Sequence, residues 1–337
     1  MHRECQRGEN HRMKRAIFCL VFCASFGPLA AAPLTPETII ALRDVEGRID
    51  HLSYDAKTNR LFVAALGNNT VEVVDLGRET VVNSIRGLSE PQAALYLPEF
   101  NQLAVTNGGD GSLRVFDGMA LAPRATIKFE DDADNARYDS VAKKIYVGYG
   151  SGALAVVDAE KNVVLGTIPL TAHPESFQLE KNGTRIFVNV PNAREIVVID
   201  RAKNQVVAKW PVREATANFP MALDEADHRL FVGCRSPAKM VVFDTENGAV
   251  VASIGIVGDA DDMWFDEVRR RIYVSGGEGF VSVISQTDLD QYTMLEKIPV
   301  AAGARTSFFD PTRRHLYVAV PHRFTQRAEI RIFDLAR

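Results

Sequence analysis

A sequence unit that recurs seven times restricts the fold of this chain more than any other feature. Each copy has an aliphatic or aromatic pair followed by Val, then a turn rich in Gly and Asn, then an alternating apolar strand that ends in Asp. Residues 60–75 read RLFVAALGNNTVEVVD, and residues 102–117 read QLAVTNGGDGSLRVFD. The closing residues lie 41 to 49 positions apart and are Asp75, Asp117, Asp158, Asp200, Asp244, Ser285 and Asp334. A repeat of this length is typical of propeller blades.

Each unit has room for four short strands, because further apolar segments such as residues 81–85 and 163–168 lie between the copies. We therefore predict an all-β fold, a seven-bladed β-propeller. The last unit lacks an outer strand, whereas residues 37–47 have the pattern of an outer strand with no unit before them. Pairing the two removes the open sheet edges. We predict a ring closed by an N-terminal strand that pairs with the C-terminal blade, in a single domain over residues 33–337.

These units resemble the YVTN β-propeller repeat, most literally in LAVTN at residues 103–107, and the resemblance covers essentially all of residues 33–337. Two departures are Ser285, which replaces the closing Asp, and the enlarged turn at residues 321–327. The family, which includes exported YncE-like members, implies a binding or scaffold domain and supplies no shared catalytic motif.

The N-terminal residues 1–32 predict a secretory signal peptide. A basic start precedes an apolar stretch over residues 16–29, and three alanines supply an A-x-A cleavage end. The polar residues before Met13 suggest that translation begins at Met13. An uncleaved anchor is the alternative, but the stretch is shorter than the ~20 residues of a spanning helix and is interrupted by Gly27-Pro28. We therefore expect a periplasmic or secreted monomer without a transmembrane span.

The positions of the cysteines and the net charge restrict how the fold can be stabilised and which partners it can bind. Cys5, Cys19 and Cys23 fall in the predicted signal peptide, so only Cys234 remains and no intrachain disulfide is expected. The chain carries a net charge of −4, and removal of residues 1–32, which carry +3, leaves −7. Because a negative protein repels polyanions, we do not expect a nucleic-acid partner.

The start of the innermost strand of each blade predicts a candidate site. In a propeller these starts gather around the central channel on one face, and here they form a ring of polar residues where a packed strand would be apolar. The ring comprises Asp50, Gln92, Asp134, Glu175, Asn218 (displaced by one residue), Asp261 and Arg305. Flanking positions add Arg48, Glu90, Asp132, His173 and Asp259 before it, and His51, Asn135, Ser176, Asp262 and Thr306 after it. We predict a pocket for a small polar ligand or a protein partner; the alternative is a polar lining of a water-filled channel.

The residue types in this ring suggest two kinds of chemistry. Clustered carboxylates suit a divalent cation such as calcium, and the candidate ligands are Asp50, Asp134, Glu175 and Asp261. Arg305 is positioned to form a bidentate ion pair with the carboxylate of a ligand. The candidate bases are His51 and His173, unless they are solvated hydrogen-bonding groups. A non-enzymatic binding propeller is thus the first hypothesis, and a metal-dependent hydrolase or lactonase, by analogy of fold, is the second.

The turns after each second strand should lie on the same face as this ring. They are residues 191–194, 235–239, 276–279 and 321–327. The longest carries His322, Arg323, Phe324 and Arg327 and is a candidate contact for a partner, with an ordinary surface insertion as the alternative. Arginines beside an aromatic residue also suggest single-stranded nucleic acid, which the negative charge opposes.

Several common catalytic and cofactor motifs are missing from this sequence, which disfavours the enzyme classes that depend on them. It contains no G-x-S-x-G, P-loop, H-E-x-x-H or C-x-x-C pattern. The Asp that closes each unit recurs with the repeat, so we interpret it as a turn-forming residue and not as a catalytic acid.

Overall fold

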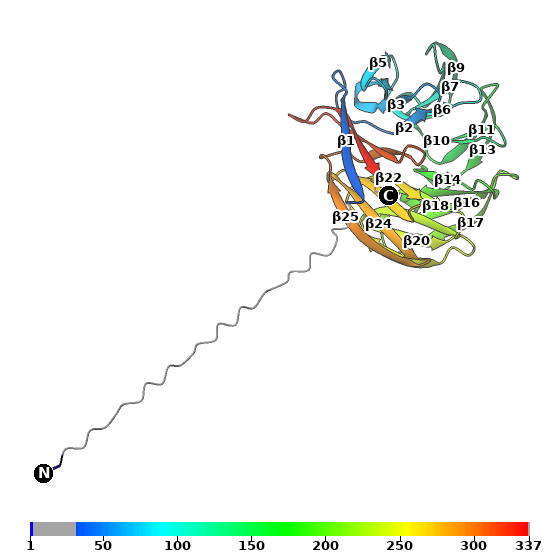
Figure 1. Ribbon diagram of the computed structural model, residues 1–337. Coiled ribbons are helices and arrows are strands. Elements are labelled where there is room, and N and C mark those ends of the chain that lie inside the picture. Colours follow the sequence, from blue (N-terminus) through cyan, green and yellow to red (C-terminus); the bar gives the residue numbers. More distant parts are fainter. Residues whose placement is uncertain (3–31, 336–337) are drawn as a thin grey trace. The chain divides into compact units, whose positions relative to one another are not determined.

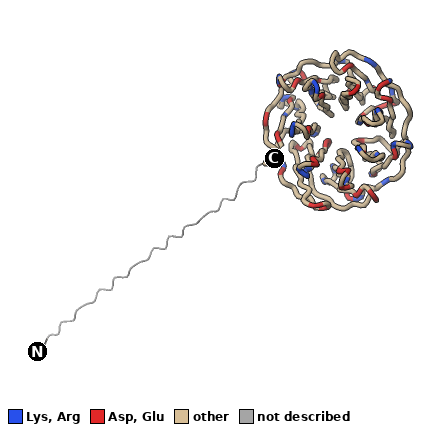
Figure 2. Tube along the Cα trace, turned by 45° about the vertical axis from the view of Figure 1, so that its right-hand side comes forward, with Lys and Arg blue, Asp and Glu red and all other residues tan. Residues whose placement is uncertain are grey.

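A computed structural model describes residues 1, 2 and 32–335. Residues 3–31 of the predicted signal peptide, with Cys5, Cys19 and Cys23, lie outside the described residues. Chain contacts separate Met1–Ala32 from the compact unit Pro33–Arg337. This unit contains seven four-stranded antiparallel sheets set as blades around one axis (Figures 1 and 2), which confirms the predicted all-β seven-bladed propeller. Within the described part of the chain, no helix has the length and apolar character needed to cross a membrane.

Six blades consist of four consecutive strands, with the first strand innermost. Blades one to three are formed by β2 (Leu52–Asp55), β3 (Arg60–Ala65), β4 (Thr70–Asp75), β5 (Thr80–Ile85); β6 (Pro91–Leu97), β7 (Gln102–Asn107), β8 (Ser112–Asp117), β9 (Pro123–Lys128); β10 (Ala133–Asp139), β11 (Lys144–Tyr149), β12 (Ala153–Asp158) and β13 (Val163–Pro169). Blades four to six are formed by β14 (Phe177–Leu179), β15 (Arg185–Val190), β16 (Glu195–Asp200), β17 (Gln205–Pro211); β18 (Thr216–Asp224), β19 (Arg229–Ser236), β20 (Ala238–Asp244), β21 (Val250–Gly255); β22 (Ala260–Asp266), β23 (Arg271–Gly276), β24 (Phe280–Asp288) and β25 (Gln291–Pro299). Blade seven contains β26 (Thr306–Asp310), β27 (His315–Val320), β28 (Glu329–Leu335) and β1 (Leu34–Ala41). Three short 3-10 turns, η1 (Leu66–Asn68), η2 (Gly108–Asp110) and η3 (Pro191–Ala193), follow second strands.

Burial differs between the strands of a blade and explains the sequence pattern. The second and third strands are covered on both faces by neighbouring blades, so they are nearly continuous apolar runs, as in β3 and β16. Outer strands such as β9 and β17 alternate between exposed and covered residues. One repeat position, the third residue of the second strand, supplies a large buried ring in six blades: Phe62, Tyr146, Phe187, Phe231, Tyr273 and Tyr317.

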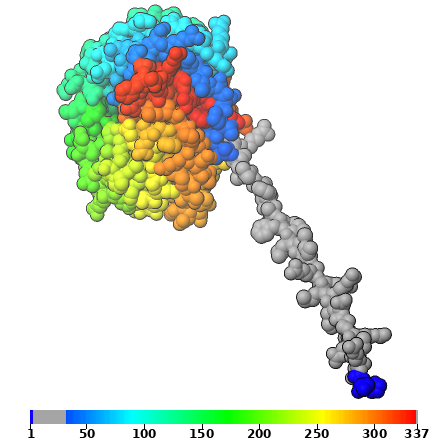
Figure 3. All heavy atoms as spheres, turned by 90° about the vertical axis from the view of Figure 1, so that its left-hand side faces the viewer, coloured from blue at the N-terminus to red at the C-terminus, as the bar shows by residue number. Residues whose placement is uncertain are grey.

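The N-terminal strand closes the ring, as predicted. It pairs antiparallel with β28, with Leu34 opposite Leu335 and Ile40 opposite Ile330, and Figure 3 shows this N-terminal segment against the last blade. The strand begins three residues before the predicted segment and ends at Ala41, and its register shifts near Pro36. Pro lacks the N–H that a sheet ladder needs, which accounts for the irregularity there.

Hydrogen bonds bear out the interpretation of the closing Asp as a turn former. Asp158 Oδ1 accepts the backbone N–H groups of Glu160 (3.0 Å) and Lys161 (2.9 Å). The same arrangement occurs at Asp75, Asp117 and Asp200. A second series of such turns joins the first and second strands; there Asp139 accepts from Val141 and Ala142.

An acidic cavity at the channel mouth as the candidate functional site

The starts of the inner strands converge on one cavity of about 250 Å³ at the end of the channel. Six of the seven ring positions line it: Asp50, Gln92, Asp134, Glu175, Asp261 and Arg305. The other lining residues are Arg48, His51, Asp132, His173, Phe219 and Arg235. Five carboxylates, two imidazoles and three guanidinium groups therefore face a space that fits only a small molecule or an ion.

Backbone geometry explains both the ring and its one displaced member. In five blades a residue with positive φ lies two positions before the lining residue, and these are Glu90, Asp132, Ala217, Asp259 and Gly303. This turn directs the next-but-one side chain into the channel. In blade five the rule selects Phe219, one position after the predicted Asn218, and Phe219 does line the cavity. Asn218 is fully buried instead, and its amide donates to Asn189 Oδ1 (3.0 Å).

On one side of the cavity His51 lies between two carboxylates. Its Nδ1 is 3.1 Å from Asp262 Oδ1, and its Nε2 is 3.6 Å from Asp50 Oδ1. The backbone N–H of Ser307 donates to Asp262 Oδ2 (2.8 Å), which holds that carboxylate in place. Arg48 Nη2 is 3.3 Å from Asp50 Oδ2.

On another side His173 stands beside Asp134 and Glu175. Ligand atoms of these three side chains lie within 4.8 Å of one another. The Nδ1 atom of His173 is 2.6 Å from the Gly150 carbonyl oxygen, so it carries the proton and donates it. Its Nε2 faces Asp134 Oδ2 at 3.7 Å and Asp132 Oδ2 at 3.8 Å. Of the four carboxylates predicted as calcium ligands, Asp134 and Glu175 thus come together, with His173 as their third neighbour.

Two arginines hold Asp261. Arg235 Nη2 is 2.6 Å from Asp261 Oδ1, and Arg305 Nε is 3.5 Å from Asp261 Oδ2. The guanidinium of Arg235 also lies 3.7 Å from the ring centroid of Phe219, which is a cation–π contact. Arg305 Nη1 makes a further ion pair with Asp259 (3.0 Å).

The lining has five carboxyl groups and only three guanidinium groups, and the pKa values respond to this excess of acids. Burial, with the neighbouring Asp134 and Asp261, raises the pKa of Glu175 to about 9. Burial also raises the pKa of Asp50 to about 7, despite the attraction of His51. Although burial opposes the charged form of each imidazole, the adjacent carboxylates raise the pKa of His51 to about 10 and that of His173 to about 9. Glu175 and both imidazoles thus retain their protons at neutral pH, and Asp50 is about half protonated, as expected where carboxyl groups crowd together.

The protonation of His51 bears on its predicted role. A histidine oriented by a carboxylate has the geometry of a general base. With its pKa at about 10, however, His51 is a cation at neutral pH and donates hydrogen bonds instead of accepting a proton. The same holds for His173, whose pKa is about 9.

Two further predicted residues shape the cavity wall, Asn135 from behind it and Gln92 within its lining. Asn135 is buried, and its side chain donates to Asp134 Oδ1 (3.4 Å) and accepts from Arg137 (3.2 Å). Gln92 donates to Asp132 Oδ1 (3.4 Å). Arg235 and Phe219 were absent from the predicted site, although residue 235 opens one of the turns predicted to rim it.

The long loop of blade seven lies near the mouth without lining the cavity. Gln326 donates to the carbonyl oxygens of Ala302 (3.0 Å) and Pro321 (2.7 Å), which fixes the loop. His322 Nδ1 is 2.7 Å from Glu46 Oε2. Phe324, with φ of 53°, is 96% exposed. Neither Arg323 nor Arg327 lines the cavity.

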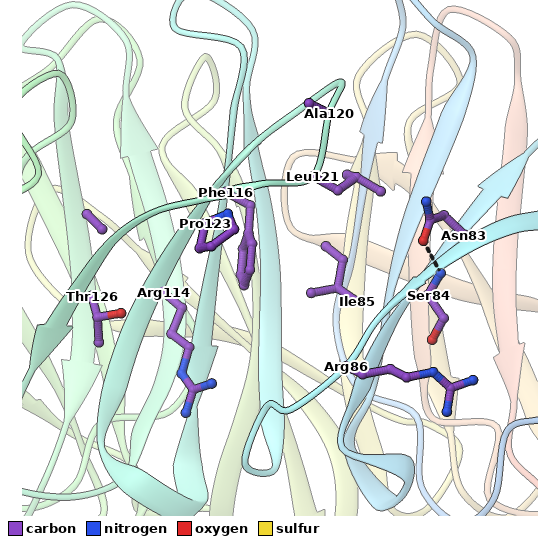
Figure 4. Close-up of a pocket in the computed structure, with 11 residues that line it drawn as sticks. Asn83, Ser84, Ile85, Arg86, Arg114, Phe116, Ala120, Leu121, Pro123 and Thr126 are labelled. Atoms are coloured by element: carbon purple, nitrogen blue, oxygen red, sulfur yellow. Dashed lines mark hydrogen bonds between the residues drawn. The ribbon is translucent and has the colours of Figure 1, made fainter.

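A second hollow lies between the outer parts of blades one and two and is shown in Figure 4. It measures about 630 Å³ and is lined by apolar Ile85, Phe116 and Leu121 and by Arg86 and Arg114. Its lining contains no histidine, cysteine or carboxylate. This groove therefore lacks the acid–base and metal-binding groups that the channel mouth contains.

Fold and cavity together define a class of protein: a seven-bladed propeller with an acidic pocket at the channel mouth. The chain is a distant relative of YncE, a YVTN-type propeller, which confirms the resemblance seen in the repeats. It is 26% identical over 198 residues to the uncharacterized proteins YncE of Salmonella typhimurium and Salmonella typhi. The match covers 57% of this chain and 55% of each relative, so the chain spans about half the length of the curated relatives it matches. No protein-family profile matches the chain.

Solved structures share the fold at much lower sequence identity. A chain of the mitotic checkpoint complex superposes with a TM-score of 0.77 at 14% identity, over 96% of this chain and 99% of that one. A chain of hydrazine synthase from Kuenenia stuttgartiensis superposes with a TM-score of 0.73 at 17% identity, over 82% of this chain and 93% of that one. At such identities the likeness shows the propeller fold alone.

Proposed function

We propose that this protein is an exported, non-enzymatic binding propeller whose channel-mouth cavity receives a small, polar, positively charged ligand. One observation carries the proposal. Asp134 and Glu175 face the cavity, and among the described residues no Lys or Arg forms an ion pair with either of them. In the part of the chain that the structure describes, His173 is the one basic side chain within ion-pair distance of Asp134, at 3.7 Å. A cationic ligand would give Asp134 a closer positive partner and let Glu175 lose its proton, because buried carboxylates are stable only when paired or protonated.

The distribution of the arginines supports the same ligand charge. Arg235 and Arg305 are both engaged by Asp261, and Arg48 by Asp50. An anionic ligand would have to displace these carboxylates, whereas a cation would reach Asp134 and Glu175 without breaking any arginine–carboxylate pair, by displacing the proton of Glu175. The cavity volume of about 250 Å³ restricts the ligand to a small amine or an ion.

Catalysis by His51 or His173 is the competing hypothesis, and the ionic state of the cavity disfavours it. A general base must be neutral at the working pH. Both imidazoles are held as cations by their carboxylate neighbours, which suits hydrogen bonding and not proton abstraction.

Two probes of equal length and opposite charge test the proposal. Putrescine is a four-carbon dication and succinate a four-carbon dianion. Thermal unfolding is measured for the chelator-treated protein with each. A ligand present at one hundred times its dissociation constant stabilises the folded state by about 2.7 kcal/mol. We expect putrescine to raise the melting temperature and succinate to leave it unchanged.

Variants then assign the effect to the cavity. Glu175→Gln and Asp134→Asn should abolish the response to putrescine, while Glu267→Gln, at an exposed position whose side chain is 64% accessible, should retain it. Stabilisation by succinate that is lost in Arg305→Ala would instead make the cavity an anion site and refute the proposal.

A further inference from the structure

Three side chains in the cavity present metal-ligating atoms toward one another. Asp134 lies at the start of β10, and His173 and Glu175 lie just before β14. One ligand atom from each falls within 4.8 Å of the other two. In a tetrahedral zinc site with bonds of about 2.0–2.2 Å, neighbouring ligand atoms are roughly 3.4 Å apart. The His173 Nε2 to Asp134 Oδ2 distance is 3.7 Å and every pair lies within 4.8 Å, so side-chain rotations would bring the three ligand atoms to coordination distance.

An anchor outside this group orients the imidazole. The Nδ1–H group of His173 donates to the backbone carbonyl of Gly150 at 2.6 Å, a residue on the neighbouring hairpin of blade three. This bond fixes the ring orientation and turns Nε2 toward Asp134, where a metal ion would replace the Nε2 proton. Metal-binding histidines typically donate their second ring N–H to a carbonyl or carboxylate in this manner.

The Asp134 carboxylate supplies a second, independent indication. Its side chain is nine-tenths buried. One oxygen, Oδ1, accepts from the Asn135 amide at 3.4 Å. The other, Oδ2, points to His173 Nε2 at 3.7 Å, which is too long for a hydrogen bond. This oxygen thus has only the distant imidazole as a charged partner, so a bound cation would give a largely buried carboxylate a closer one.

We infer that Asp134, His173 and Glu175 bind a divalent transition-metal ion, with zinc as the reference ion. This inference rests on the proposed function, because it concerns the same cavity and names the cation. A mixed imidazole and carboxylate set favours zinc and its neighbours over calcium, which prefers six to eight oxygen ligands. Asp50 and Asp261 do not complete an oxygen shell here, since they are engaged by Arg48 and by the Arg235–Arg305 pair.

Asp132 is available as a further ligand. Its Oδ2 lies 3.8 Å from His173 Nε2, and its side chain is 44% exposed. This position lets it approach an ion from the solvent side. The fourth coordination position would then be filled by Asp132 or by water.

The test measures metal binding by the full-length protein with Cys5, Cys19 and Cys23 replaced by Ser, because those thiols would themselves bind zinc. After chelation, Zn²⁺, Co²⁺ and Ca²⁺ are titrated in turn by calorimetry, and the Co²⁺ complex is followed by its visible absorption. We expect one Zn²⁺ per chain, a tetrahedral-type or five-coordinate Co²⁺ spectrum and no saturable binding of Ca²⁺.

Two variants and one control locate the ion. Asp134→Asn, which preserves size, and His173→Ala should each weaken Zn²⁺ binding at least roughly 100-fold. The control is His228→Ala, a half-exposed histidine in the turn between β18 and β19, which should bind Zn²⁺ as the unmodified protein does. Unfolding curves show whether each variant is folded. If His173→Ala does not fold, the isosteric Asp134→Asn variant alone decides whether the three residues bind the ion.

The outcomes separate this inference from the proposed function. Absence of stoichiometric Zn²⁺ binding, or Zn²⁺ binding that survives in both Asp134→Asn and His173→Ala, overturns the metal site. If the metal site is overturned but putrescine still stabilises the protein in a manner that depends on Glu175, the cavity is a site for an organic cation. Failure of both probes would overturn the function and the metal site together.

Discussion

The closing strand β1 allows a comparison of two adjacent isoleucines whose side chains point to opposite faces. Ile40 is 1% exposed and packs among Ile330, Ala328 and Tyr317, whereas Ile39 is 57% exposed. Replacing Ile40 with Ala removes three carbons. At about 0.8 kcal/mol for each carbon, the loss of burial costs roughly 2.5 kcal/mol, and the cavity left behind brings the expected destabilisation to about 2–5 kcal/mol.

The matched variant Ile39→Ala removes the same atoms from the solvent-facing side of the same strand. Its expected effect lies within about 0.5 kcal/mol, as for surface substitutions in general. Urea unfolding followed by tryptophan fluorescence measures both variants, because Trp210 in β17 of blade four and Trp264 in β22 of blade six lose their packing when the ring unfolds. Unchanged slopes with a shifted midpoint would show that stability alone has changed.

An equal loss of unfolding free energy in Ile39→Ala and Ile40→Ala would refute this packing. A larger loss in Ile39→Ala would mean that β1 pairs with β28 one residue out of register, since a slip of one residue exchanges the two faces of a strand. No loss in either would mean that β1 does not contribute to the stability of the ring.

Four further predictions address the cavity, a blade junction, the thiol and export. The folded-state pKa of Glu175 is about 9, above its ordinary 4.5, so its contribution to stability is lost as pH rises through that window. In the presence of chelator, Glu175→Gln should therefore raise the melting temperature at pH 8 and change it little at pH 4.5. Equal effects at both pH values would contradict this. Asp139→Ala should destabilise by about 3 kcal/mol or more in urea, because it frees two turn N–H groups and leaves Arg201, 13% exposed, without its carboxylate partner; Asp139→Asn should lose less. Cys234 is buried, and burial raises its pKa to about 12, so it should react with a thiol reagent only after unfolding, and rapid labelling of the native protein would disprove the packing. N-terminal sequencing of the exported chain should begin at Pro33, and a start at Met1 or Met13 would rule out cleavage.

The sequence was sufficient to predict the blades because their physical basis is local. A continuous apolar run such as β3 indicates a strand buried on both faces, and an alternating run such as β9 indicates a strand buried on one face. The closing Asp of each unit reports a turn through its own backbone contacts, as at Asp158. Closure by the N-terminal strand followed from the unpaired edge, although the strand runs from Leu34 to Ala41 and not over the predicted residues 37–47, with a register shift beside Pro36.

The candidate site was predicted in position but not in its internal pairing. Aligned strand starts gave six of the seven ring positions that line the cavity, and the seventh was missed because the left-handed residue Ala217 shifts the register to Phe219. Sequence order alone does not show that His173 joins Asp134 and Glu175 while Asp261 joins two arginines. Those pairings depend on the distances between blades, which only the three-dimensional structure supplies.

The central claim is that the channel mouth is a cavity of negative potential that favours a cation. An NMR pH titration of the imidazole rings tests it most directly, in the presence of chelator and with His51→Gln and His173→Gln variants to assign the signals. The account predicts that both rings are charged at pH 8, with His51 losing its proton near pH 10 and His173 near pH 9. Titration of either ring at its ordinary value of about 6.5 would show that the carboxylates around it do not create that potential, and the account would fail.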